Sequence, residues 1–190
     1  MFRWFALATL VGCLGISAYF RRRAHRESET IPRSREGVPL RVGRSLVALP
    51  LFLGAVAYVA NPRWMAWASL PLPTWSRWLG VGLGLLTVPA AYWVFTSLGR
   101  NVSETVLTKE RHELVTGGPY RWIRHPLYTT GIALFVALGL MAANWFILLF
   151  AFVALAGILL VVIPIEERAL LAKFGEAYRG YMRRTGPLWP

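Results

Sequence analysis

Two groups of polar residues stand where apolar segments of this sequence begin and end. His125 and Tyr128 flank Pro126 at the start of one apolar block, and Glu166 and Glu167 follow another. Pro126 suits the first position of a helix, and the spacing places Tyr128 near His125 on the helix surface. Adjacent carboxylates at a membrane boundary are costly unless they are solvated or paired. We therefore expect the acidic pair to receive a cationic group or a pair of hydroxyls.

The segment before His125 is suited to folding back on itself. Gly117-Gly118-Pro119 is a cluster that reverses the chain, so residues on its two sides come together. A residue before proline is biased toward extended backbone, which leaves the His125 ring at the mouth of the following helix. The start of that helix offers unpaired backbone N–H groups to a carboxylate or ribose oxygen. Taken singly, the same residues also fit ordinary polar and aromatic positions in the headgroup zone.

The elements that position these groups are apolar helices. Hydrophobic residues make up 56% of the chain and charged residues 16%, whereas a soluble domain carries about a quarter charged residues. The apolar residues fall into five blocks, each near the ~20 residues that span a bilayer, over 3–20, 44–60, 76–97, 127–142 and 145–163. We predict an all-α, multi-pass transmembrane protein of about five spans. Only residues 143–144 separate spans four and five, so they form a tight hairpin that returns Glu166 and Glu167 to His125.

The basic residues predict which way the spans run. Eighteen of the 21 Lys and Arg residues, and all nine Glu, lie in the segments 21–44, 98–126 and 164–190. Five spans place these segments on one face, and the positive-inside rule makes that face cytoplasmic. The N-terminus is then outside and the C-terminus inside, in a bacterial inner membrane. Because the basic residues alternate with apolar blocks, we expect contact with membrane lipids and none with nucleic acid.

The first span also has the look of a lipoprotein cleavage box at Leu10-Val11-Gly12-Cys13. The apolar run continues to Phe20 and then meets three arginines, which is typical of a membrane anchor. We expect the single cysteine, Cys13, to face lipid without a partner and to form no disulfide. We expect no metal site. Trp64, Trp67, Trp75 and Trp78 predict an outer aromatic belt, and Gly80, Gly82 and Gly84 permit close helix packing.

An ordered set of residues resembles the isoprenylcysteine carboxyl methyltransferases and their bacterial relatives over residues 98–183. The set is His112…Leu114-Val115-Thr116-x-Gly118-x-Tyr120…Arg124-His125-Pro126-x-Tyr128, then Glu166-Glu167, then Phe174-Gly175-x-x-Tyr178-x-x-Tyr181. The resemblance implies a membrane enzyme that uses S-adenosylmethionine. It implies an adenine and ribose pocket at His112, Leu114, Val115 and Tyr120. It also implies contacts of His125, Pro126 and Tyr128 with the rest of the cofactor, whose polar end is held by Glu166 or Glu167. The amphipathic, aromatic character of the tail, 174–181, separately leads us to expect that it closes over such a pocket.

The sequence departs from that family just before the acidic pair. The prenylcysteine enzymes carry an arginine about one turn earlier, whereas residues 159–164 here hold no charge. A carboxylate acceptor would need another cation, with Arg124 and Arg168 as candidates, and a lipid amine or a thiol is equally open. We divide the chain into three N-terminal spans, 1–97, and a cofactor-binding catalytic region, 98–190.

The leading hypothesis is a methyltransferase that moves a methyl group from S-adenosylmethionine to a lipophilic acceptor. The cofactor enters from the cytoplasm and the acceptor enters laterally from the bilayer. Two alternatives stay open. Membrane sterol reductases share an Arg-His-Pro-x-Tyr element, which makes an NADPH-dependent reductase the second hypothesis. A non-catalytic membrane scaffold is the third, and it leaves the ordered cluster without a reason.

Overall fold

The computed structural model describes residues 1–27, 38–99 and 114–190, and in these ranges the protein is helical. Only two isolated bridges and no β-strand occur among these residues. The helices are α1 (Phe2–Glu27), α2 (Val38–Ala60), η2 (Pro62–Ala68), α3 (Thr74–Leu98), η4 (Gly118–Arg121), α4 (Pro126–Ala142), α5 (Trp145–Gly157), η5 (Ile158–Val162), α6 (Ile163–Phe174) and α7 (Glu176–Met182). The all-α prediction is confirmed.

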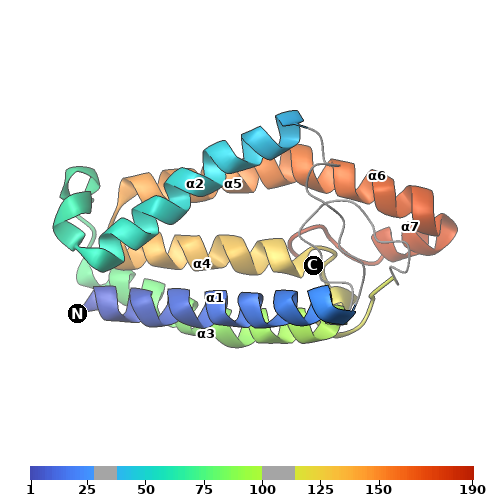
Figure 1. The fold of residues 1–190 in the computed structure, drawn as a ribbon, viewed down its shortest axis with the longest axis horizontal. Coiled ribbons are helices and arrows are strands. Elements are labelled where there is room, and N and C mark those ends of the chain that lie inside the picture. Colours follow the sequence, from blue (N-terminus) through green and yellow to red (C-terminus); the bar gives the residue numbers. More distant parts are fainter. Residues whose placement is uncertain (28–37, 100–113) are drawn as a thin grey trace.

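The long helices pack side by side in a bundle (Figure 1). Helix α4 lies in the middle, where it contacts α1 and α3 on one side and α2 and α5 on the other. Four stretches are long and apolar enough to cross a membrane, Phe2–Arg26, Val38–Ala60, Thr74–Leu98 and Trp145–Phe174. Helix α4 is apolar but shorter, with 17 residues. These helices coincide with the five predicted blocks and confirm the multi-pass fold; the orientation across the membrane stays a prediction.

The fifth span is longer than the sequence predicted. We expected it to end at residue 163, but α5, η5 and α6 form one continuous helix to Phe174. Pro164 has no N–H to give and its ring crowds the preceding turn, which normally ends a helix. Here the preceding turn is a π-helix, in which the Ile163 N–H reaches back to the Ile158 carbonyl and the chain continues past the proline. Glu166 and Glu167 therefore lie inside a helix, not after its end.

The predicted hairpin between spans four and five is present. Ala143 ends α4 in the left-handed region, with φ 47°, and Asn144 starts α5. The buried Asn144 side chain accepts from the Ile147 N–H at 3.1 Å and donates to the Met65 carbonyl at 3.0 Å. One side chain thus caps α5 and ties the hairpin to η2.

Small residues let α3 approach α4 closely. A Cβ on Gly80 would lie 2.8 Å from the Met141 backbone nitrogen, and one on Gly84 would lie 2.6 Å from the Met141 Cε. A Cβ on Gly82 would meet nothing. The contact therefore uses two of the three predicted glycines, four residues apart on one face of α3.

Cys13 differs from its prediction. Its side chain is buried between α1 and α3, and its sulfur lies 3.8 Å from the Thr87 hydroxyl. The prediction that Cys13 faces lipid without a partner was wrong. Helix α1 packs the face that carries Cys13 against α3, and another apolar face of α1 is exposed.

Exposed tryptophans gather at the end of the bundle where α1, α3 and α5 begin and where α2 and α4 end. We call this the tryptophan end. The exposed rings there are Trp4, Trp64, Trp67, Trp75, Trp78 and Trp145. The opposite end, where α4 begins and α6 carries its two glutamates, is called the acidic end.

Candidate functional site

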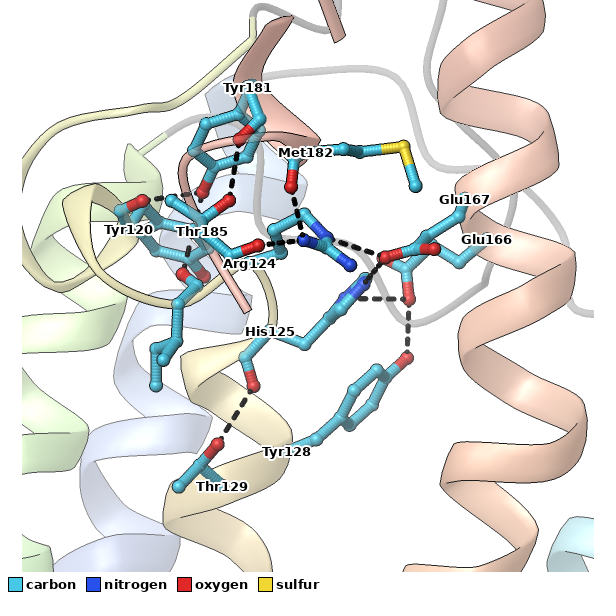
Figure 2. A network of polar contacts seen from close by, with 11 residues as sticks. Tyr120, Arg124, His125, Tyr128, Thr129, Glu166, Glu167, Tyr181, Met182 and Thr185 are labelled. Atoms are coloured by element: carbon cyan, nitrogen blue, oxygen red, sulfur yellow. Dashed lines mark hydrogen bonds and ion pairs between the residues drawn. The ribbon is translucent and has the colours of Figure 1, made fainter. Parts of the chain in front are cut away.

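At the acidic end, the start of α4 meets α6 through polar side chains (Figure 2). The Tyr128 hydroxyl donates to Glu166 Oε2 at 2.9 Å. His125 lies between the two carboxylates, with Nδ1 3.6 Å from Glu166 Oε2 and Nε2 3.4 Å from Glu167 Oε1. The buried His125 ring also stacks on Tyr128, at 5.7 Å between ring centroids. The structure therefore brings together the two groups that the sequence singled out.

Arg124 completes this cluster from the other side. Its Nε donates to Glu167 Oε1 at 2.7 Å, and the two side chains are only 9% and 15% exposed. Its Nη1 donates to the carbonyls of Met182 and Thr185. Arg124 thus joins α4, α6 and the chain after α7. Arg168, the other candidate cation, is exposed on α6, one residue beyond Glu167.

The tail after α7 lies along the segment that leads into α4. The Arg124 N–H donates to the Gly186 carbonyl at 2.9 Å and the His125 N–H to the Pro187 carbonyl at 3.0 Å. The Thr129 hydroxyl donates to the Leu188 carbonyl at 2.9 Å. The sequence predicts unpaired backbone N–H groups at the start of this helix, and for its N-cap residue, His125, this is wrong. The tail satisfies the N–H groups of Arg124 and His125, so it is part of the site's framework.

The chain reversal before α4 is anchored on α3 and α7. Gly118 has φ +60°, and a Cβ there would overlap the Ser97 hydroxyl of α3. The buried Tyr181 hydroxyl of α7 donates to the Tyr120 carbonyl at 2.6 Å. Burial raises the pKa of Tyr181 to about 12, and burial followed by the charge of Glu166 raises the pKa of Tyr120 above its usual value. Both phenols are therefore protonated at neutral pH.

Tyr178 is a further member of the site. Its side chain is 1% exposed, and its hydroxyl has no hydrogen-bond partner among the described residues. Burial, and then the charge of Glu167, raises the pKa of this phenol, so its hydroxyl lies within the field of the acidic cluster. A buried hydroxyl without a partner is rare in native proteins and asks for an explanation. The sequence analysis placed Tyr178 in the tail motif but not among the site residues, and Gly175-x-x-Tyr178 was the available signal.

The remaining predicted residues are placed as follows. Pro126 is buried at the first position of α4, and Leu114 and Val115 are half-buried in the irregular segment before Gly117. His112 lies outside the described residues. In the described ranges, no three His, Cys, Asp or Glu side chains are placed to hold a metal ion.

The cluster holds more carboxylates than arginines. Glu166 and Glu167 lie beside one guanidinium at the start of α4, that of Arg124, which pairs with Glu167. Glu166 on α6 and the Tyr178 hydroxyl on α7, which lacks a partner among the described residues, lie on two helices that contact each other. The arrangement can hold a ligand that combines a positive charge with hydroxyl or amine donors.

Comparison with a solved structure shows a shared fold, and a family model identifies the class. The eukaryotic intramembrane Ras methyltransferase, isoprenylcysteine carboxyl methyltransferase, shares this fold with a TM-score of 0.55 over 84% of this chain and 54% of that chain, at 21% identity. The profile of the phospholipid methyltransferase family matches residues 75–177, more than half of the chain. The chain belongs to this family of membrane methyltransferases. The match takes in Arg124, His125, Tyr128 and the acidic pair, whereas Tyr178 and the tail lie beyond it.

Curated relatives match parts of the chain. Methanethiol S-methyltransferase of Mycobacterium tuberculosis is 42% identical over 71 residues, which is 37% of this chain and 28% of the relative. The cobalt-zinc-cadmium resistance protein CzcN of Cupriavidus metallidurans is 32% identical over 118 residues, which is 62% of this chain and 52% of the relative. The matches thus span from about a quarter to half of the relatives' own length.

Proposed function

We propose that this protein transfers a methyl group from S-adenosylmethionine to a lipophilic acceptor, and that the cluster at the acidic end holds the cofactor. The observation that carries this proposal is the acidic pair on α6, fixed by Tyr128, His125 and Arg124 beside the unpartnered Tyr178 hydroxyl. The acidic pair, Tyr128, His125 and Arg124 lie in the region where the methyltransferase family matches, and Tyr178 lies one residue beyond it.

The residues fit the charge of this cofactor. S-adenosylmethionine carries a sulfonium, an ammonium and a carboxylate, so its net charge is positive, and the cluster offers it two carboxylates, one of which pairs with Arg124. Glu166 would hold the ammonium or the ribose hydroxyls, because Tyr128 leaves its other oxygen available. The Tyr178 hydroxyl would gain the partner that it lacks among the described residues. NADPH carries several phosphate charges, which the acidic pair would repel.

Other residues would position these groups. Arg124 fixes Glu167 and the tail, and His125 keeps the two carboxylates apart. Tyr120, Leu114 and Val115 would line the adenine and ribose part, together with His112. The region 98–190 is thus proposed as the cofactor-binding part of the chain and 1–97 as its membrane support.

The chemistry requires alignment more than acid–base catalysis. When bound, S-adenosylmethionine supplies an electrophilic methyl group, which an acceptor attacks in line. The protein's task is to align the two partners and to exclude water. The tail, the start of α4 and α6 hold the polar groups of the cluster in place through their mutual contacts, which serves the task of alignment. A general base is needed only for a protonated acceptor, and no residue is assigned to that role.

The acceptor would come from the lipid phase. Residues 159–163, just before the acidic pair, are apolar, and Leu160 and Val161 are exposed on the helix surface. The relatives and the family name a thiol, a prenylcysteine carboxyl group and a phospholipid as acceptors. Neither Arg124, which is occupied by Glu167, nor the exposed Arg168 is presented to a carboxylate as the arginine of the prenylcysteine enzymes is. We therefore favour a small lipophilic thiol or amine, approached from the bilayer while the cofactor enters from the cytoplasmic side.

The test is calorimetric titration of the purified protein with S-adenosylhomocysteine. Glu166→Gln removes a charge-assisted contact and is expected to weaken binding at least tenfold. Tyr178→Phe removes one hydroxyl and is expected to weaken binding about threefold to tenfold. The matched control is Glu176→Gln, which removes an exposed glutamate on α7 whose ion pair in the described part of the chain is with Arg179, and it should leave binding unchanged.

Two results would overturn the proposal. One is no binding of S-adenosylhomocysteine by the wild-type protein, together with thermal stabilisation by NADPH, which would favour a reductase. The other is an equal affinity of the Glu166→Gln and Glu176→Gln variants, which would move the cofactor away from this cluster. If neither cofactor stabilises the protein, the scaffold hypothesis takes precedence.

A further inference from the structure

Arg77 on α3 holds the far end of α4, at the tryptophan end. Its Nε and Nη2 donate to the Met141 carbonyl at 3.0 and 2.8 Å, and Nη2 lies 3.5 Å from the Tyr58 hydroxyl. The guanidinium also lies over the Phe2 ring, 4.1 Å from its centroid. All of these partners are neutral, so they fix the orientation of the cation without offsetting its charge.

A cavity of about 320 Å³ opens beside this arginine. That volume is at the lower end of the ~300–1,000 Å³ that ligand pockets occupy. Its lining includes Arg77, Arg3, Ser69 and Asn144, together with apolar side chains such as Phe2 and Met65. It contains no acidic residue. The glutamates in the described part of the chain are Glu27 at the far end of α1, the acidic pair of α6, and Glu176 of α7.

Two arginines without a carboxylate make this cavity selective for an anion. A partly buried cation in a membrane protein is costly unless an opposite charge or a polar surrounding stabilises it. The Asn144 side chain is already used by Ile147 and Met65, so it adds little to the balance. Arg3 lies over the Trp4 ring, 4.4 Å from its centroid, which is again a neutral partner. An anionic group that enters the cavity would give both arginines a partner of opposite charge.

The surroundings of the cavity indicate where that anion comes from. Exposed tryptophans at the same end, among them Trp64, Trp67 and Trp78, are of the kind that settles at the headgroup level of a bilayer. We propose that this cavity binds the phosphate of an anionic phospholipid, with Arg77 and Arg3 on the phosphate and Phe2 and Met65 against the glycerol and upper acyl chain. Arginine suits phosphate because its planar donors match two phosphate oxygens.

The test is native mass spectrometry of the full-length protein titrated with short-chain phosphatidylglycerol or phosphatidylcholine in detergent. We expect wild-type protein to retain one phosphatidylglycerol in preference to phosphatidylcholine. The Arg3→Gln and Arg77→Gln double variant should bind phosphatidylglycerol at least tenfold more weakly. Arg3→Gln alone, which breaks no hydrogen bond described in the structure, should give a smaller loss, and so keeps the test valid if Arg77→Gln fails to fold.

Arg63→Gln is the matched control. Arg63 is an exposed cation on η2 at the same end but outside the cavity lining, so its substitution should leave binding within about twofold. Equal losses in Arg63→Gln and Arg3→Gln would overturn the proposal in favour of general surface attraction. Equal binding of the two lipids would also overturn it. Complete displacement of the lipid by millimolar inorganic phosphate would replace the lipid site with a small-anion site.

Discussion

An arginine binds at each end of α4, but the two arginines have different kinds of partner. At its start, Arg124 pairs with Glu167 and also holds two carbonyls of the tail. At its end, Arg77 donates to the Met141 carbonyl and meets the Tyr58 hydroxyl, with no carboxylate. A cation at a helix C-terminus and acidic groups at an N-terminus both follow the helix dipole. The arginine at the first end is therefore paired with a carboxylate, whereas the arginine at the second end has neutral partners.

This difference distinguishes an arginine that positions other protein groups from an arginine that we propose binds a ligand. Arg124 has three partners, one of them charged, and so acts on the site by positioning other groups. Neutral groups fix the position of Arg77, so its positive charge remains available to an anionic ligand. The number of hydrogen bonds does not tell the two apart. The charge of the acceptors does.

The largest effect is expected from Arg124→Gln. It leaves Glu167 in a mostly buried position without its cation, which typically costs about 3–5 kcal/mol of stability. The midpoint temperature of thermal unfolding in detergent should therefore be clearly lower than that of the wild-type protein. The control Arg179→Gln breaks a pair whose side chains are 62% and 79% exposed, and should cost less than about 0.5 kcal/mol. Similar midpoints for the two variants would contradict the account of Arg124.

A smaller effect is expected from Arg77→Gln. The substitution removes hydrogen bonds to the Met141 carbonyl but leaves no unpaired carboxylate behind, so we expect a loss of about 1–2 kcal/mol. The same thermal measurement checks this. A loss as large as that of Arg124→Gln would remove the distinction between the two ends. Added phosphatidylglycerol should stabilise the wild-type protein more than the variant.

Two tyrosines of α7 allow a closer comparison of stability at the acidic end. Tyr181→Phe removes a hydroxyl that donates to the Tyr120 carbonyl at 2.6 Å, and should cost about 1 kcal/mol. Tyr178→Phe removes a buried hydroxyl with no partner in the described residues, so stability should stay equal or rise. Chemical denaturation in mild detergent can compare the two variants. If Tyr178→Phe loses as much stability as Tyr181→Phe, the hydroxyl has a partner and its proposed part in ligand binding fails.

The smallest expected effect is a pH dependence of stability in the alkaline range. The pKa of Tyr181 is raised by burial from its usual 10 to about 12, and those of Tyr120 and Tyr178 are raised too. A raised pKa in the folded state means that stability is fully present below pH 10 and is lost as the pH rises through 12. The unfolding midpoint should fall over that range, and less steeply for Tyr178→Phe. An identical slope would show that Tyr178 does not contribute.

The sequence predicted the bundle well because its signals are local. The apolar blocks, the two-residue connection at Ala143 and Asn144, and Pro126 at the start of α4 each specify structure without reference to distant residues. The juxtaposition of His125 with Glu166 followed from the hairpin alone. The family resemblance, and not the spacing of residues, is what suggested a methyltransferase.

The parts that escaped prediction depend on distant contacts. The tail carbonyls of Gly186 and Pro187 reach the start of α4 across about sixty residues, and no local pattern marks a backbone acceptor. Which face of α1 is buried decides the surroundings of Cys13, and a uniformly apolar helix does not reveal this. The Tyr178 hydroxyl is conspicuous only once its neighbours are known to leave it without a partner.

The π-helical turn at Ile158–Val162 makes the number of residues in the fifth span important, and not only their hydropathy. An α-helix turns by about 100° per residue, and a π turn holds one residue more than an α turn. A π turn is thus equivalent to an α-helix with one residue inserted, and the helix that follows keeps its rotational phase. A further residue inserted between Asn144 and Pro164, with no second π turn to take it up, would rotate Glu166 and Glu167 by about a quarter turn, away from His125 and Tyr128. Insertions in this apolar stretch, invisible to a hydropathy plot, should be tolerated less well than most exchanges of its side chains.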